Sequence, residues 1–129
     1  MKEQLIKSIP LDNGQVLNIY DASKNIAGDR WQVNLVARMF ISVHEINTEN
    51  NAVLPPADGI KQALGDTVEY EVKKQRNFID DKEKKTVLTD LLDTFIKYSV
   101  PYLSHPEFAK RLIVKKYQEY KKRLPEQYT

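Results

Sequence analysis

Cysteine is absent from this chain of 129 residues. The protein can therefore form no disulfide, hold no cysteine-ligated zinc or iron–sulfur cluster, and use no thiol as a nucleophile. Glycine is scarce, with four residues, and the sequence contains neither a glycine-rich phosphate-binding motif nor the Gly-x-Ser-x-Gly motif of many hydrolases. The two histidines belong to no recognised metal-binding motif. We therefore expect no catalytic residue, no metal site and no cofactor.

Long hydrophobic runs are missing as well. No apolar segment approaches the roughly 18 residues of a membrane span, and the first residues lack the apolar core of a signal peptide. Together with the lack of cysteine, this leads us to expect a cytoplasmic location and no membrane span. The hydrophobic fraction of 41% and the charged fraction of 29% are those of a folded globular protein. At this length we expect residues 1–129 to form a single domain.

Alternation of apolar and polar residues predicts the strands. It is strictest over residues 30–44, where every second side chain is apolar, as in a strand with one buried face. Residues 67–74 alternate in the same way and predict a half-exposed strand. The segments Leu5–Ile9 and Gln15–Asp21 flank an Asn-Gly pair, which is typical of a tight turn, and predict an N-terminal hairpin.

Helical periodicity predicts a short helix near 58–64 and two longer C-terminal helices over about 81–98 and 105–123. We expect the first long helix to begin near Asp80 and to end before Pro101. We expect the second to begin with a capping box at Ser104. The sequence thus predicts an α+β fold: a two-layer domain with a mainly antiparallel sheet of about four strands packed by the two C-terminal helices. The residues expected in its core are Trp31, Leu35, Met39, Leu88, Leu91, Phe95, Phe108, Leu112 and Tyr117.

The loop before the long strand holds the densest group of chemically capable side chains. Carboxylates, a hydroxyl and a guanidinium occur together there and could bind a polar ligand or perform acid–base chemistry. Alternatively, such residues bond to nearby backbone groups in Asx and Ser turns. Arg76 stands near the expected junction between the last strand and the first long helix, a common position for ligand-binding groups. The candidate ligand-binding residues are Asp21, Ser23, Asp29, Arg30 and Arg76.

Basic residues gather toward the C-terminus. Residues 1–66 carry 6 Lys and Arg against 8 Asp and Glu, whereas residues 67–129 carry 14 against 10. On the last helix the basic side chains share the side opposite to the apolar residues, so they could contact nucleic acid or an acidic partner. A solvated lysine-rich face is the alternative interpretation. The residues of this candidate surface are Lys110, Arg111, Lys115, Lys121 and Lys122.

These patterns lead to three functional hypotheses. The first is a small soluble binding or adaptor module without catalysis, whose partner is another protein. The second is nucleic-acid binding through the basic C-terminal helix. The third is an enzyme or a small-ligand receptor that uses the 21–30 loop. The oligomeric state and the strand order are open at this level.

Overall fold

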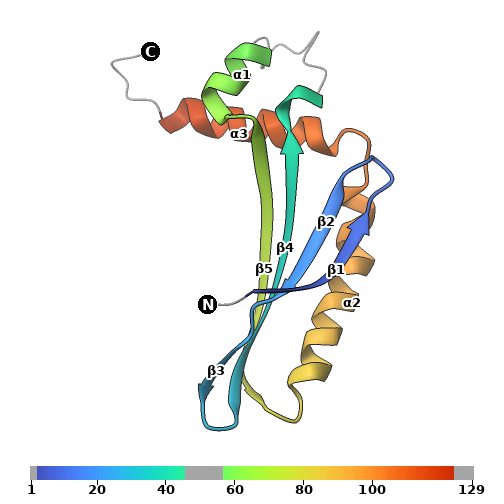
Figure 1. Cartoon of the computed structure of the whole chain (residues 1–129), viewed down its shortest axis with the longest axis vertical. Coiled ribbons are helices and arrows are strands. Elements are labelled where there is room, and N and C mark those ends of the chain that lie inside the picture. The colour runs from blue at the N-terminus through green and yellow to red at the C-terminus, as the bar shows by residue number, and fades with distance from the viewer. Residues whose placement is uncertain (1–2, 46–56, 124–129) are drawn as a thin grey trace. The chain divides into compact units, whose positions relative to one another are not determined.

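A computed structural model describes residues 3–45 and 57–123 of the chain. The predicted α+β fold with a mostly antiparallel sheet is confirmed (Figure 1), although the sheet has five strands. The elements in chain order are β1 (Gln4–Pro10), β2 (Val16–Asp21), β3 (Lys24–Ala27), β4 (Arg30–Ser42), the 3-10 helix η1 (Val43–Glu45), α1 (Ala57–Leu64), β5 (Thr67–Asp80), α2 (Lys84–Leu103) and α3 (Phe108–Arg123).

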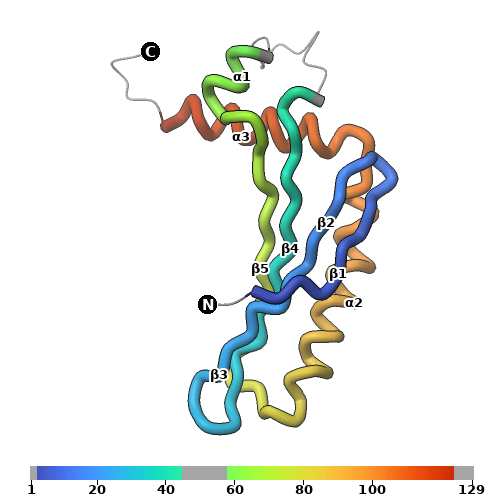
Figure 2. The backbone as a smooth tube through the Cα atoms, in the orientation of Figure 1, coloured from blue at the N-terminus to red at the C-terminus, as the bar shows by residue number. Residues whose placement is uncertain are grey.

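The long strand β4 organises the sheet. β1 pairs with β2, and β2 and β3 pair antiparallel with successive stretches of β4. β5 also pairs with β4. β3 is the strand that the sequence did not predict, because its four residues are all exposed and show no apolar alternation. Figure 2 follows the backbone as it turns from β3 directly back into β4.

The chain forms two compact units. The first unit contains the residues up to Met39 together with Glu71–His105, and the second contains Phe40–Tyr70 together with the residues from Pro106 onward. The first unit therefore holds β1, β2, β3, α2 and most of β4 and β5. The expectation of one domain over residues 1–129 stays a prediction.

The core of the first unit lies on one face of the sheet, where α2 covers it. From Val33 to Met39 every second side chain of β4 is buried, as the alternation predicts, and Val33 and Leu35 are no more than 1% exposed. Trp31, which we expected in the core, is only half-buried, and the ammonium of Lys84 lies over its ring at 3.7 Å from the centroid. The buried apolar residues of this unit include Leu17, Ile19, Val33, Leu35, Ala37, Met39, Leu91, Phe95 and Leu103.

The predicted hairpin turn is also confirmed. Gly14 has a φ of +87°, a backbone conformation that glycine adopts without steric cost. The amide of Asn13 donates hydrogen bonds to the carbonyls of Leu103 and His105, at 2.8 and 3.0 Å. The turn between β1 and β2 is therefore tied to the C-terminal end of α2.

α2 continues through Pro101, so the expected helix end before this residue is wrong. A proline inside a helix removes one hydrogen bond and bends the helix. Leu103 in the following turn is completely buried, however, and the N–H of Ser104 donates to the carbonyl of Val100 at 2.9 Å. Burial and backbone bonding together hold the last turn in the helix. Because Ser104 is the C-cap residue of α2, it does not begin the next helix, and α3 starts at Phe108.

β5 extends to Asp80, six residues beyond the predicted end at residue 74. Phe78 interrupts its regular alternation with a φ of +57°, which is rare for a residue with a bulky side chain. Its ring is 73% exposed. The side chain of Asn77 bonds to Gln32 of β4 on the face away from α2, whereas Ile79 lies on the face toward α2. The irregularity at Phe78 therefore shifts the following residues by one position.

The second unit has its own core. Val43 donates its N–H to the carbonyl of Asp66 at 2.9 Å, and the rings of Tyr70 and Phe108 meet edge to face at 5.5 Å. α3 turns four apolar side chains inward, and Tyr117, which we expected in the core, is only half-buried. The buried residues of this unit include Ile41, Val43, Ile60, Val68, Phe108, Ala109, Leu112 and Ile113.

Phe95→Ala tests the packing of α2 on the sheet. Phe95 is 4% exposed, and loss of a buried phenyl ring costs about 3–5 kcal/mol through lost burial and the cavity that remains. We expect urea unfolding to show a decrease of this size in the free energy of unfolding. Thr89→Ala, on the exposed side of the same helix, should change it by less than about 0.5 kcal/mol. Equal stability of both variants would contradict the assigned helix face.

Candidate functional site

A pocket of about 420 Å³ lies within the first unit, between β5 and α2. We call it the β5–α2 pocket. Its volume falls in the range of about 300–1,000 Å³ that is usual for ligand sites. All of its lining residues belong to β5 or α2: Lys74, Arg76, Ile79, Val87, Asp90, Leu91, Thr94, Phe95, Tyr98 and Ser99.

The floor of the pocket is apolar. Val87, Leu91 and Phe95 follow each other at four-residue intervals on α2, and this spacing places them in one row along the helix. Leu91 and Phe95 also belong to the buried core. Ile79 joins them from β5 because the irregularity at Phe78 turns it toward the helix. The floor is thus continuous with the core.

The rim on the helix side is polar. Asp90, Thr94 and Tyr98 form a second row at four-residue intervals, and all three are exposed. Tyr98 is 70% exposed. This row supplies a carboxylate and two hydroxyls, groups that can accept or donate hydrogen bonds to a bound molecule.

The rim on the strand side is cationic. Lys74 and Arg76 are two residues apart on β5, so their side chains lie on the same face, toward α2. Arg76 donates from Nη1 to the carbonyl of Gln75 at 2.9 Å. Within residues 3–45 and 57–123, no carboxylate forms an ion pair with Lys74 or Arg76. Both cations are therefore available to an anionic group in the pocket.

The outer edge of β5 borders this pocket. β5 pairs with β4 on one side, and no strand in the described part of the chain pairs with its other side. Figure 1 shows β5 at the margin of the sheet. An unpaired edge offers backbone N–H and C=O groups to a further strand.

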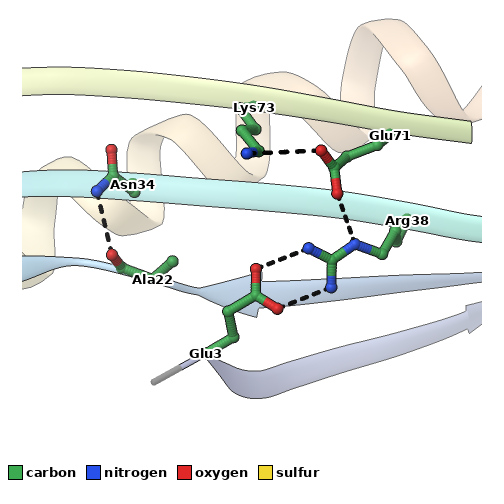
Figure 3. Close-up of polar contacts among 6 residues, drawn as sticks. All are labelled: Glu3, Ala22, Asn34, Arg38, Glu71 and Lys73. Carbon is green, nitrogen blue, oxygen red and sulfur yellow. Dashed lines mark hydrogen bonds and ion pairs between the residues drawn. The ribbon is translucent and has the colours of Figure 1, made fainter. Parts of the chain in front are cut away.

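The structure divides the residues of the predicted loop site into two groups. Asp21 accepts the N–H of Ser23 at 2.9 Å, and the hydroxyl of Ser23 accepts the N–H of Asn34 at 3.1 Å. These two side chains thus form a local turn that joins the loop to β4. Figure 3 shows the neighbouring bond from the Asn34 amide to the carbonyl of Ala22, which is 3.1 Å long.

The second group surrounds Arg30. Its guanidinium lies 3.4 Å from Asp80 and 3.8 Å from Asp29; Asp29 is largely exposed, whereas Arg30 and Asp80 are partly exposed. Arg76 lies apart from both groups, in the β5–α2 pocket. Ligand binding by the loop residues stays a prediction.

Sequence reasoning identified Arg76 but not the other rim residues. Because the strand was predicted to end at residue 74, the continuation of its alternation to Arg76 was missed. The irregularity at Phe78 has no sequence signal. The row Asp90, Thr94 and Tyr98 was visible as a four-residue spacing beside the apolar row of the same helix. It could have been read as the rim of a site if its neighbour in space had been known.

The predicted basic surface lies on α3, in the second unit. Arg111, Lys115, Lys121 and Lys122 are exposed and Lys110 is half-buried, while the buried side of the helix is apolar. The ammonium of Lys121 lies 6.0 Å from the ring centroid of Tyr117. Among the described residues, no carboxylate forms an ion pair with these five cations.

A charged cluster around Arg38 occupies the sheet face opposite to the pocket (Figure 3). The guanidinium of Arg38 binds both oxygens of Glu3, at 2.8 and 2.7 Å, and its Nε donates to Glu71 at 2.7 Å. Tyr20 lies beneath it, 5.1 Å from ring centroid to guanidinium carbon. The hydrogen bonds from Arg38 lower the pKa of Glu3 and of Glu71 below the ordinary value. Lys73 lies 3.6 Å from Glu71, so the two carboxylates face two cations, and we assign the cluster a structural role.

The described residues contain no group of three or more metal-binding side chains, and none of their helices is both long and apolar enough to cross a membrane. Comparison with known proteins gives no significant match: no protein-family model, curated protein or solved structure is similar to this chain.

Arg38→Met tests the charged cluster through its pH dependence. Because the pKa of Glu3 and Glu71 is lowered in the folded protein, their contribution to stability is present at neutral pH and is lost as the pH falls below about 4.5. We expect the free energy of unfolding of the variant to be about 1–2 kcal/mol lower than that of the natural chain at pH 7. The difference from the natural chain should shrink toward pH 3 in urea titrations.

The control is Lys73→Met, which removes an exposed cation 3.6 Å from Glu71. This variant should differ from the natural chain by less than about 0.5 kcal/mol at both pH values. A destabilisation of Arg38→Met that is the same at pH 7 and pH 3 would contradict the electrostatic role of Arg38.

Proposed function

We propose that this chain is a non-catalytic binding module that takes up a segment of another protein in the β5–α2 pocket. One observation carries the proposal: an apolar floor with a polar rim lies directly beside an unpaired strand edge. Apolar surface supplies affinity, and polar groups around it fix the orientation of what is bound.

A protein segment fits this arrangement better than a small molecule. The pocket is bounded by a strand and a helix, and the free edge of the strand continues beyond the pocket. An extended polypeptide can bond to such an edge through its backbone while one of its side chains enters the pocket. A small molecule would use the pocket alone.

The chemistry of the lining supports binding without catalysis. Asp90 is the one carboxylate among the described lining residues, and these residues include no histidine and no cysteine. The hydroxyls of Thr94, Tyr98 and Ser99 would need a nearby base to become nucleophiles. The lining residues therefore lack the paired acid and base of common hydrolytic sites.

Thr94→Trp tests the pocket as the binding site. The indole placed on the rim should fill the opening above Phe95 and abolish uptake of a side chain. We expect selection from a random peptide display library to enrich peptides on the natural chain but not on Thr94→Trp. The readout is the affinity of the enriched peptides, measured by fluorescence anisotropy, which should fall by at least about tenfold, the equivalent of 1.4 kcal/mol.

Thr89→Trp is the matched control, because it adds the same ring to an exposed position of α2 that does not line the pocket. It should bind the enriched peptides as the natural chain does. Failure of the natural chain to enrich any peptide, or equal binding by Thr94→Trp, would reject the proposal.

A second candidate function is binding of nucleic acid by α3. The supporting observation is that the exposed side of this helix presents cations without carboxylate partners among the described residues. Lys and Arg that neutralise phosphates release counterions, so such binding weakens as salt is added. The test is a titration of labelled single- and double-stranded nucleic acid at low and near-physiological salt.

The triple variant Lys115→Glu, Lys121→Glu and Lys122→Glu should reduce the affinity for nucleic acid by about tenfold or more, because it replaces three phosphate-binding charges by repelling ones. Anisotropy of the labelled strands is the measurement. The control makes the same charge change at exposed lysines of the first unit: Lys7→Glu, Lys24→Glu and Lys85→Glu. Equal losses in the two triple variants would show that net charge, and not α3, governs the binding.

A further inference from the structure

We infer that the segment bound at the β5–α2 pocket is an extended strand that pairs with the outer edge of β5 and carries an acidic and an apolar residue two positions apart. Its carboxylate faces Lys74 and Arg76, and its apolar side chain lies over the floor of the pocket. The inference rests on the proposed function and specifies the chemistry of the partner.

The first argument is the placement of charge on β5. Lys74 and Arg76 lie on the sheet face toward α2, where both side chains are exposed to solvent and the preceding residue on that face, Val72, is half-buried. Among the described residues neither has a carboxylate within ion-pair distance. A carboxylate brought by a ligand would form charge-assisted hydrogen bonds with them.

The second argument is the spacing along the edge. A ligand strand beside β5 points every second side chain toward α2, with about 6.6–6.8 Å between successive side chains on that face. Next to it, β5 presents two cations and then Ile79 on the same face, because Phe78 breaks the alternation. The complementary ligand therefore has an acidic residue, one residue of any kind, and an apolar residue.

The charges also argue against a second copy of this chain as the occupant. Pairing two β5 edges in a register that sets Lys74 and Arg76 of one copy against those of the other would place like charges on adjacent strands, and like charges there destabilise the pairing. An acidic segment removes this repulsion. The two cations on the face toward α2 thus favour a strand that brings an acidic side chain to this face.

The backbone of the edge remains able to bond. The carbonyl of Gln75 already accepts one hydrogen bond from Arg76. A carbonyl oxygen has two lone pairs, so it can accept a second bond from a ligand N–H.

Asp90 faces the pocket from the helix side and opposes a ligand carboxylate. Its removal should therefore favour the ligand that Lys74 and Arg76 attract.

The test uses two labelled peptides, Ser-Glu-Ser-Phe-Ser-Glu-Ser and Ser-Lys-Ser-Phe-Ser-Lys-Ser, both acetylated and amidated. Glutamate on both sides of phenylalanine allows either strand direction. We expect the acidic peptide to bind in fluorescence anisotropy at low salt and the basic peptide to bind at least about tenfold more weakly. Binding of the acidic peptide should weaken as salt is added.

Two exposed rim residues provide variants of opposite sign. Arg76→Gln should weaken binding of the acidic peptide by about fivefold to tenfold, and Asp90→Asn should strengthen it by a factor of about two to five. Both side chains are exposed, so neither change threatens folding, and the circular dichroism spectra should be unchanged.

Strand pairing is tested by N-methylation of the acidic peptide. One derivative is methylated at the two inner serines and the other at phenylalanine and the second glutamate. Only alternate N–H groups of a paired strand point to its neighbour. One derivative should therefore lose binding by about tenfold or more while the other retains it.

The outcomes separate the two proposals. If the random library yields peptides but the acidic and basic probes bind equally, or if neither or both methylated derivatives lose binding, the acidic strand is wrong and the binding module stands. If the library yields no peptide, the binding module itself is rejected. The expected pattern in both experiments supports the binding module and the acidic strand.

Discussion

The register of β4 against its neighbours determines what each face of the first unit presents. Leu35 faces the core because every second residue of the strand does, and Arg38 must then face the opposite side. A slip of one residue would exchange the two sets. The same pairing places Glu71 of β5 beside Arg38 and sends Arg76 to the other face. The charged cluster and the β5–α2 pocket are thus separated by the thickness of the sheet.

At Phe78, β5 departs from the regular alternation of side chains between the two sheet faces, and this departure shapes the pocket. With regular alternation, Phe78 would follow Arg76 on the face toward α2. Its positive φ instead turns Ile79 inward and leaves the phenyl ring exposed. Strain of this kind persists only where the surroundings hold it, and the bond from Asp81 to the carbonyl of Asp29 fixes the strand just beyond it.

Much of the fold could be predicted from the sequence because alternation and periodicity of apolar residues indicate directly which side chains are buried. The buried face of β4, the Asn-Gly hairpin and the apolar rows of α2 and α3 follow from side-chain spacing alone. The errors have physical causes. Pro101 is tolerated because Leu103 is buried beyond it, and β3 forms from exposed residues through its pairing with β4. Neither effect can be read from local sequence.

The candidate site was less accessible to sequence reasoning for the same reason. A pocket needs two elements, and the contact between β5 and α2 depends on where the strand ends and where its alternation breaks. The loop residues looked more reactive than the pocket residues because they stand close together in the sequence. In the structure, Asp21 and Ser23 use their polar atoms on nearby backbone groups.

Pro101 gives α2 an uneven resistance to opening. A proline has no N–H, so the carbonyl of Lys97 receives no bond from the residue four positions ahead. The last turn therefore has one backbone bond fewer, and the burial of Leu103 and the amide of Asn13 add to the bonds that hold it. Native-state amide exchange would accordingly divide α2 at this point, with the final turn opening together with the β1–β2 hairpin.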